Sequence, residues 1–368
     1  MRPQLAAILL LAAVAMPAYG AESTDTAGWH LGKNVERVKA ELEERGWNNR
    51  DSIAAKGAIA RGVINAADWW RRTFDTYDTT YVCSVKYKVK VQLLEDNWID
   101  SYSLDLESGK PLRWRSPFTA TIGASASYLG ISLGFNIDIS ESRKRAPSKR
   151  KVFSFELSKS RVNLRVRYIR NVNDDNNLEQ EIISPGLPDL RLDGITNKIW
   201  DIAGYYIFNH RHYCQSAAYS YSKVQRRSSG SLLAGFSIML NNVRANLYDP
   251  NSRLPLYSEL SDFRLLSNNY TAIVGYGYNW VPARNFVVNV TACPSIGWRY
   301  GHETSADGTD VSAYSFALGI HSRAAVTYAW RHLVFSLQGH FYRELYHRSG
   351  YSFRSQVANF GLKVCYRF

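Results

Sequence analysis

The final segment of the chain, QVANFGLKVCYRF at residues 356–368, constrains the fold more than any other feature. Successive side chains of a β-strand point to opposite faces, and here one face is almost wholly apolar while the other is mostly small or charged. Strands of transmembrane barrels need this arrangement, with apolar side chains toward lipid and polar side chains toward the interior. An open strand edge in a bilayer would leave backbone groups unpaired, so the strand must belong to a closed ring.

The apolar face of this segment is interpreted as the membrane-insertion signal, which would make the barrel-assembly machinery a partner of the chain. It comprises Phe360, Leu362, Val364, Tyr366 and Phe368.

The same alternation recurs from residue 78 onward, most clearly over 81–93, 129–139 and 270–280. It predicts an all-β protein, an antiparallel transmembrane β-barrel of about 12 strands. The number becomes 14 if residues 98–106 and 200–208 both span. Residues 213–221 also alternate and are expected to form a strand, and Pro294 is expected to bend or end the pairing of its strand. An aromatic-rich soluble β-sandwich is the alternative fold.

The start of the chain differs in pattern. Residues 1–20 combine Arg2, a short apolar core and small residues before Ala21, which predicts a cleaved secretory signal peptide. Residues 21–77 are expected to form a periplasmic helical segment, and residues 78–368 the barrel. The helical segment is interpreted as a pair that packs under the barrel mouth, with a plug or an amphipathic membrane-surface helix as alternatives.

The formal charge of +13 raises the question of a nucleic-acid partner. An exported chain rarely meets nucleic acid, so outer-membrane lipid and anionic lipopolysaccharide are the expected partners. Beyond the signal segment no apolar run is long enough for a spanning helix. The 24 tyrosines, 15 phenylalanines and 10 tryptophans suit the aromatic girdles of an outer-membrane barrel, and the expected location is the cell outer membrane.

Cationic residues on the polar faces are the candidate functional residues, because a cationic lumen selects anions by its potential. The alternative is a small sealed barrel whose charges pair with Asp138, Glu156 and other acids. The candidates are Lys86, Lys88, Lys90, Arg165, Arg167, Arg323, Arg343, Lys363 and Arg367.

Three stretches resemble a known family: GYYIFN at 204–209, SAAYSYSKVQRRSSGS at 216–231 and GYGYNWVPARN at 275–285. The family is an uncharacterised one of Bacteroidota envelope proteins, labelled a domain of unknown function. The resemblance covers about residues 78–368 and implies an outer-membrane β-barrel. It implies no activity and no catalytic residue.

The expected function is passage of small, anionic solutes across the outer membrane. A structural, assembly or partner-binding barrel without an open pore is the alternative, and a barrel-embedded hydrolase is the third. The hydrolase is disfavoured because Ser336 and His340 lie about 13 Å apart on one strand.

The four cysteines form no CxxC motif, and no metal or cofactor is predicted. Cys83 and Cys365 lie on opposite strand faces and are not expected to form a disulfide.

Overall fold

The computed structural model divides the chain into two compact units, residues 1–76 and 77–368. The structure describes residues 65, 69, 74, 76–87, 89–106, 112–115, 118–128, 131–139, 149–172, 180–182, 191–192, 196–245, 263–304, 310–348 and 351–368. The predicted signal peptide and most of the predicted helical segment lie outside these residues. Within them, no helix has the length and apolar character needed to cross a membrane.

The elements of the second unit are almost all strands. They are β1 (Val82–Ser84), β2 (Val89–Leu106), β3 (Leu112–Arg115), β4 (Thr119–Tyr128), β5 (Ile131–Asp138), β6 (Lys149–Ser158), β7 (Val162–Val172), β8 (Gln180–Ile182), β9 (Arg191–Leu192), β10 (Thr196–Ile207), α5 (Ser216–Tyr219), β11 (Lys223–Gln225), β12 (Ser229–Ala245), β13 (Phe263–Ala283), β14 (Phe286–Thr304), β15 (Asp310–Trp330), β16 (Leu333–Arg348) and β17 (Tyr351–Arg367).

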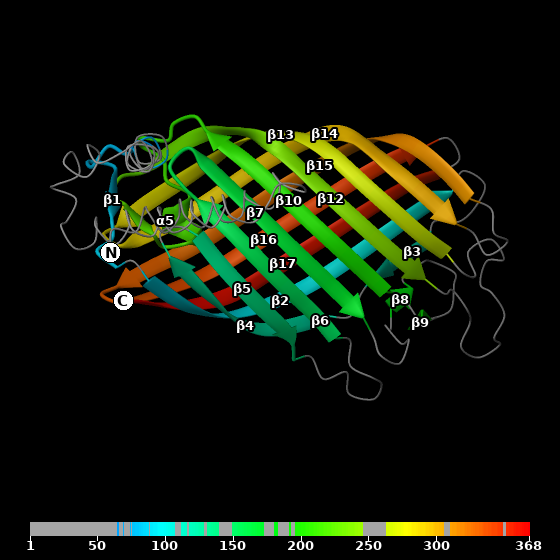
Figure 1. Ribbon diagram of the computed structural model, residues 1–368, viewed down its shortest axis with the longest axis horizontal. Coiled ribbons are helices and arrows are strands. Elements are labelled where there is room, and N and C mark those ends of the chain that lie inside the picture. The colour runs from blue at the N-terminus through cyan, green and yellow to red at the C-terminus, as the bar shows by residue number, and fades with distance from the viewer. Residues whose placement is uncertain are drawn as a thin grey trace, which may run out of the picture. The chain divides into compact units, whose positions relative to one another are not determined.

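Twelve antiparallel strands close into a barrel, as predicted (Figure 1). The ring runs β2, β4, β5, β6, β7, β10, β12, β13, β14, β15, β16 and β17. It closes because β17 pairs with β2 along nearly its whole length, from Tyr351 opposite Leu106 to Arg367 opposite Lys90. Strands β3, β8 and β9 extend the sheet from β2 at one end, and β1 pairs with β11 at the other.

The outer wall of the ring is apolar and the inner wall is polar. Along β5, Leu133, Phe135 and Ile137 are about half exposed, whereas Asn136 between them is buried. The predicted insertion-signal residues also point outward, with exposures from 40% at Val364 to 61% at Phe368. In water such a wall would be an apolar surface far larger than a soluble monomer presents. This is the wall of an outer-membrane β-barrel.

Aromatic side chains gather at both ends of the outer wall, where a membrane has its interfaces. At the end of the barrel where the C-terminus lies, Trp330, Tyr366 and Phe368 are exposed. Toward the other end, Tyr270 pairs with Trp298, which pairs with Phe316 on the next strand. The two girdles delimit the lipid-facing belt.

The strand count was right, but two of the predicted strands were wrong. Residues 89–106 form one long strand instead of the two segments expected at 81–93 and 98–106. Residues 213–221 form no strand: they turn into the barrel and include the buried helix α5. The strand at 196–207 takes their place in the ring.

Pro294 does not end its strand, because β14 continues through it to Thr304, but the pairing with β13 is interrupted there. Pro294 pairs with Ile320 of β15, and on the side of β13 the recorded pairs stop at Ala292 and resume at Ser295. Proline lacks an N–H group, so it removes one bond of the ladder without ending the strand.

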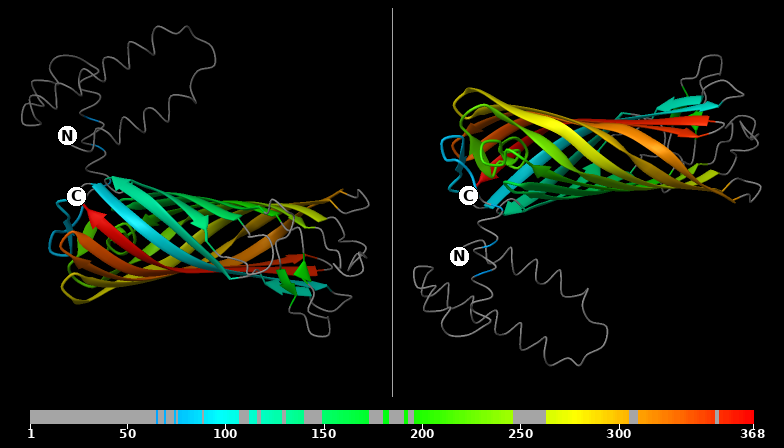
Figure 2. Two further views of the ribbon diagram at one scale, coloured as in Figure 1. Left: turned by 90° about the horizontal axis from the view of Figure 1, so that it is seen from below. Right: turned by 90° about the horizontal axis from the view of Figure 1, so that it is seen from above.

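The connection between β10 and β12 folds back into the barrel and is called the plug, residues 208–228. Figure 2 shows it inside the end of the barrel where the C-terminus lies. Residues 213–221 are buried throughout. The short turns at 284–285 and 331–332 lie at the same end, which is the periplasmic end in barrels of this type.

Replacing Leu337 with arginine tests the lipid-facing wall. Leu337 is 50% exposed on the outer face of β16, between the outward residues Phe335 and Phe341. An arginine there is expected to destabilise the barrel folded in vesicles by about 2–4 kcal/mol, because the charged side chain faces hydrocarbon. The control is His347→Arg on the same strand near its far end, which should cost about 1 kcal/mol or less. Equal costs at the two positions would contradict the assignment of the wall.

Candidate functional site in the barrel lumen

Six of the nine predicted cations point into the barrel. These are Lys90, Arg165, Arg167, Arg323, Lys363 and Arg367. Lys86 is exposed in the segment before β2, and Lys88 lies outside the described residues.

The prediction for Arg343 was wrong, because its side chain is exposed on the outer wall. It has the same parity as Phe335, Leu337 and Phe341, and strand alternation places all four on one face. Lys86 was misplaced for another reason, since the barrel strand begins only at Val89.

Lys90 and Arg367 bind backbone carbonyl groups at the periplasmic end. Lys90 Nζ donates a hydrogen bond to the carbonyl of Ser220 in the plug. Arg367 Nη2 donates to the carbonyl of Arg331 in the β15–β16 turn at 2.6 Å. These two cations therefore hold the plug and a turn rather than an open surface of the lumen.

A second cationic group lies deeper, where β7 and β10 pair. Arg167 donates from Nε at 2.9 Å and from Nη2 at 2.6 Å to Oδ2 of Asp201. Arg165 Nη2 lies 3.6 Å from the same oxygen. One buried carboxylate thus neutralises only one of two neighbouring guanidinium groups.

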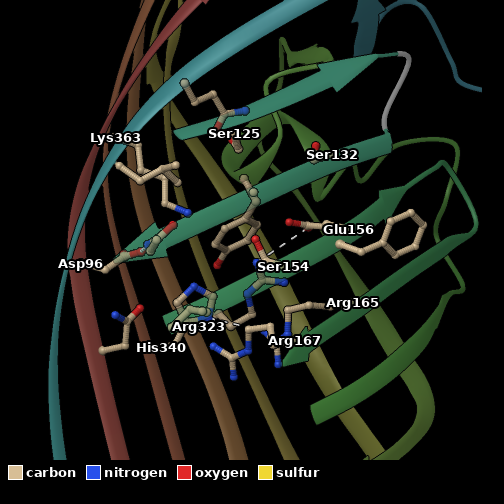
Figure 3. A pocket seen from close by; sticks show the side chains of 18 of the residues that line it. Asp96, Ser125, Ser132, Ser154, Glu156, Arg165, Arg167, Arg323, His340 and Lys363 are labelled. Atoms are coloured by element: carbon tan, nitrogen blue, oxygen red, sulfur yellow. Dashed lines mark hydrogen bonds and ion pairs between the residues drawn. The ribbon is translucent and has the colours of Figure 1, made fainter. Parts of the chain in front are cut away.

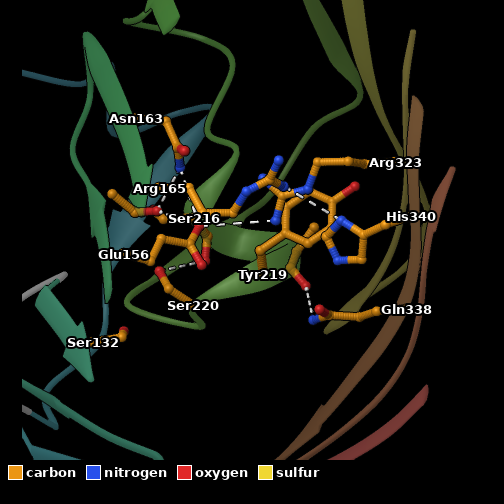
Figure 4. Close-up of polar contacts among 12 residues, drawn as sticks. Ser132, Glu156, Asn163, Arg165, Ser216, Tyr219, Ser220, Arg323, Gln338 and His340 are labelled. Carbon is orange, nitrogen blue, oxygen red and sulfur yellow. Dashed lines mark hydrogen bonds and ion pairs between the residues drawn. The ribbon is translucent and has the colours of Figure 1, made fainter. Parts of the chain in front are cut away.

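Arg323 of β15 connects this group to the plug (Figure 4). Its Cζ lies 3.8 Å from the centroid of the Tyr219 ring in α5, a cation–π contact. Its Nη2 is 3.9 Å from Oε1 of Glu156, which also accepts hydrogen bonds from Ser158 and Asn163. Nε and Nη1 of Arg323 have no hydrogen-bond partner among the described residues.

A cavity of about 90 Å³ lies between these groups (Figure 3). Four cationic side chains line it, from Arg165, Arg167, Arg323 and Lys363, against two carboxylates, from Asp96 and Glu156. Asp96 already accepts a hydrogen bond from Asn136 at 2.9 Å, and no ion pair of Lys363 is recorded among the described residues. The cavity therefore has an excess of positive charge.

His340 lies beside the cationic side chains of the cavity. Its Nδ1 lies 3.5 Å from Nη1 of Arg165. On the same strand, Ser336 contacts Thr327 at 2.9 Å, on the side of the plug. Ser336 and His340 therefore have separate partners and do not form a nucleophile–base pair.

The plug is joined to the inner wall by hydrogen bonds from several strands. Asn279 Nδ2 donates a hydrogen bond to the carbonyl of Cys214 at 2.9 Å, and Asn289 Oδ1 accepts one from the hydroxyl of Tyr219 at 2.7 Å. Thr327 Oγ1 donates to the carbonyl of Ala218 at 3.1 Å. The polar inner faces of β13 to β15 thus supply hydrogen bonds to the part of the plug around α5, which pairs with no strand.

Gly277 on β13 leaves room for the plug. A β-carbon at this position would collide with the hydroxyl group of Tyr213, which is fully buried and accepts a hydrogen bond from Asn289. Glycine is needed here because of this close approach.

Asp78, outside the barrel strands, helps to hold the outer part of the plug. Its carboxylate accepts hydrogen bonds from the hydroxyl and the backbone amide of Thr80, and lies 3.4 Å from His212. These hydrogen bonds, with the nearby imidazole, lower the pKa of Asp78.

No group of three or more His, Cys, Asp or Glu side chains among the described residues could hold a metal ion. The four cysteines are free thiols, and Cys365 lies inside the barrel while Cys83 belongs to β1.

The sequence reasoning missed the plug and Asp201. One signal could have revealed the plug: residues 213–221 contain no leucine, isoleucine, valine or phenylalanine, which the lipid-facing sides of the other strands have in abundance. Asp201 lies in residues 200–208, which from the sequence were only a possible spanning strand, so its inward position could not be derived.

Residues 76–368 match the family described as "Domain of unknown function (DUF4421)". The chain belongs to this family. The predicted resemblance to a family of unknown function is thereby confirmed, although its bacterial group stays a prediction. No curated protein matches the chain.

The solved structures similar to the barrel include a protease and two transporters. The outer membrane protease OmpT from Escherichia coli has a TM-score of 0.40 at 10% identity, covering 77% of this chain and 99% of its own. The P. putida toluene transporter TodX has a TM-score of 0.25 at 8% identity, covering 76% of this chain and 90% of its own. The Ralstonia pickettii toluene transporter TbuX has a TM-score of 0.26 at 9% identity, covering 77% of this chain and 90% of its own. These likenesses concern the fold alone.

Replacing Asp201 with asparagine tests the charge balance of the lumen. Arg165 and Arg167 would then face each other without their shared counter-charge, so the free energy of unfolding should fall by about 3 kcal/mol. Denaturant titration of the refolded barrel measures it. Glu156→Gln is the comparison, and it should cost less because Arg323 lies 3.9 Å away. Unchanged stability of the Asp201 variant would show that the cluster is solvated.

Proposed function

We propose that this protein passes small anionic solutes across the outer membrane through a lumen that the plug gates. The observation that supports this most is the cavity between Arg165, Arg323 and Lys363, whose lining has more cationic groups than carboxylates. Low-dielectric walls strengthen the attraction of such a group for an anion. A carboxylate or phosphate would supply the acceptors that Arg323 lacks.

The cavity is directly next to the plug, which gives the gate its physical basis. Tyr219 of α5 lines the cavity and also stacks under Arg323, so an anion that draws Arg323 away removes a contact of the plug. The plug connects β10 to β12, and its one strand pairs with β1 outside the ring, so it can move without breaking any strand pair of the ring. Binding and opening are coupled through Arg323 in this proposal.

The number of bonds between the plug and the wall favours a second candidate, a sealed barrel that serves as a structural or docking element of the envelope. The plug forms hydrogen bonds with the side chains of Asn279, Asn289, Thr327 and Gln338. If these bonds are never released, the cationic cluster serves only to balance charge within the wall. The two candidates differ in one measurable property, ion conductance.

Gly277→Ala is designed to loosen the plug. The added methyl group displaces Tyr213, so openings in planar bilayers should become more frequent or longer than in the unchanged protein. Gly339→Ala is the matched control, because a β-carbon there meets only the carbonyl of Asn359, at 3.9 Å. If neither the unchanged barrel nor Gly277→Ala conducts while both are folded, the sealed barrel replaces the gated one.

Lys363→Gln tests the anion preference of the same cavity. In the Gly277→Ala background, removal of this inward charge should lower the chloride-to-potassium permeability ratio by about twofold or more, because one fewer cation attracts the anion. The control is Arg343→Gln in that background, which removes an outward charge of the same sign. An equal change in both variants would mean that net charge alone, and not the cavity, sets selectivity.

A further inference from the structure

Three cationic side chains form a row on the outer wall of β6, β7 and β10. Lys151 pairs with Arg170 in the β6–β7 ladder, and Arg170 pairs with Lys198 in the β7–β10 ladder. All three side chains are exposed, and all have the outward parity of Phe153 and Trp200. They are called the outer cationic row. Strands are about 4.8 Å apart, so the row is roughly 10 Å wide.

A second row lies directly beside it, two residues further along each strand. Phe153 pairs with Tyr168, and Tyr168 pairs with Trp200. The rings of Tyr168 and Trp200 are 4.8 Å apart. This is part of the aromatic girdle, and such side chains mark the level where hydrocarbon meets headgroups. The cations are therefore one pleat repeat, about 7 Å along the strand, beyond that level.

The direction of this step can be read from the strands. Lys151 is near the start of β6, Arg170 near the end of β7 and Lys198 near the start of β10 (Figure 1). These ends lie opposite the C-terminus, the plug and the short turns, so they are the extracellular ends. The outer cationic row is consequently at the headgroup level of the outer leaflet.

Cross-strand neighbours of like charge destabilise a sheet. The row contains two such pairs in succession, and no carboxylate partner of its three members is recorded among the described residues. Ile137 and Asn242, which continue the row on β5 and β12, are uncharged. The wall therefore has a concentration of positive charge that an external anion would neutralise.

We propose that the outer cationic row binds the phosphate groups of a phosphorylated glycolipid, lipopolysaccharide, in the outer leaflet. A phosphate between two neighbouring strands lies within reach of two of the three cations, and charge-assisted bonds to phosphate are among the strongest in proteins. The aromatic row beneath packs against the sugar and the first part of the acyl chains. The site is separate from the lumen and does not depend on the proposed passage of solutes.

The test compares two triple variants of the full-length protein. Lys151→Gln, Arg170→Gln and Lys198→Gln together remove the row. Arg284→Gln, Arg331→Gln and Arg343→Gln together remove three exposed cations elsewhere, so both variants lose the same net charge. Native mass spectrometry of each folded barrel titrated with purified lipopolysaccharide measures binding. The row variant should bind about tenfold more weakly or worse, and the control variant should bind like the unchanged protein.

Two further arms identify the source of the phosphate. Dephosphorylated lipopolysaccharide should bind the unchanged protein as weakly as intact lipopolysaccharide binds the row variant. Inorganic phosphate at the concentration of the lipid should not displace it, because only the lipid adds contacts with Phe153, Tyr168 and Trp200. Equal binding by the two triple variants, undiminished binding of the dephosphorylated lipid, or displacement by equimolar inorganic phosphate would each overturn the proposal.

Discussion

Closure of the backbone hydrogen-bond ladder is the constraint on which the rest of this structure depends. Hydrocarbon offers no hydrogen bonds, so a wall of strands in a bilayer must end on itself. Here the junction is the pairing of β17 with β2. Once the ring is closed, alternation divides every strand into a lipid side and a lumen side, and the chemistry of each side follows. The outer side is mostly apolar, with aromatic girdles and headgroup-level cations, and the inner side collects most of the polar and charged residues.

The inner side then poses a second problem, because twelve strands enclose more space than their own side chains fill. The chain fills one end with its own residues 208–228. Only β11 of the plug pairs with a strand, namely β1, so the inner faces of β13 to β15 supply hydrogen bonds to the rest through Asn279, Asn289 and Thr327. Above the plug, charge is only partly balanced: Asp201 serves both Arg165 and Arg167, and Lys363 faces the cavity without a recorded ion pair. The plug and the cationic cavity are thus adjacent consequences of one filling problem.

The two proposed anion sites differ in what surrounds the charge. In the lumen, guanidinium groups are buried beside carboxylates and a tyrosine ring, and a ligand must compete with existing bonds. On the outer wall, Lys151, Arg170 and Lys198 are exposed beside an aromatic row, and no carboxylate partner of theirs is recorded among the described residues. A small solute suits the first environment, and an amphipathic lipid, with phosphate above and acyl chains below, suits the second.

The sequence by itself determined the class of fold, the number of strands and the facing of most residues, because period-2 alternation is a local property that lipid and lumen impose on each strand separately. It also determined that Phe360, Leu362, Val364, Tyr366 and Phe368 face outward and that Lys90, Arg165, Arg323 and Lys363 face inward. The tertiary structure alone decided that residues 213–221, which alternate as well as any strand, leave the wall and enter the lumen. It likewise decided that Asp201 meets Arg165 and Arg167, and that three cations from separate strands stand side by side. These facts depend on the register between strands, which is set by the closure of the whole ring and by the volume inside it, and no single segment contains that information.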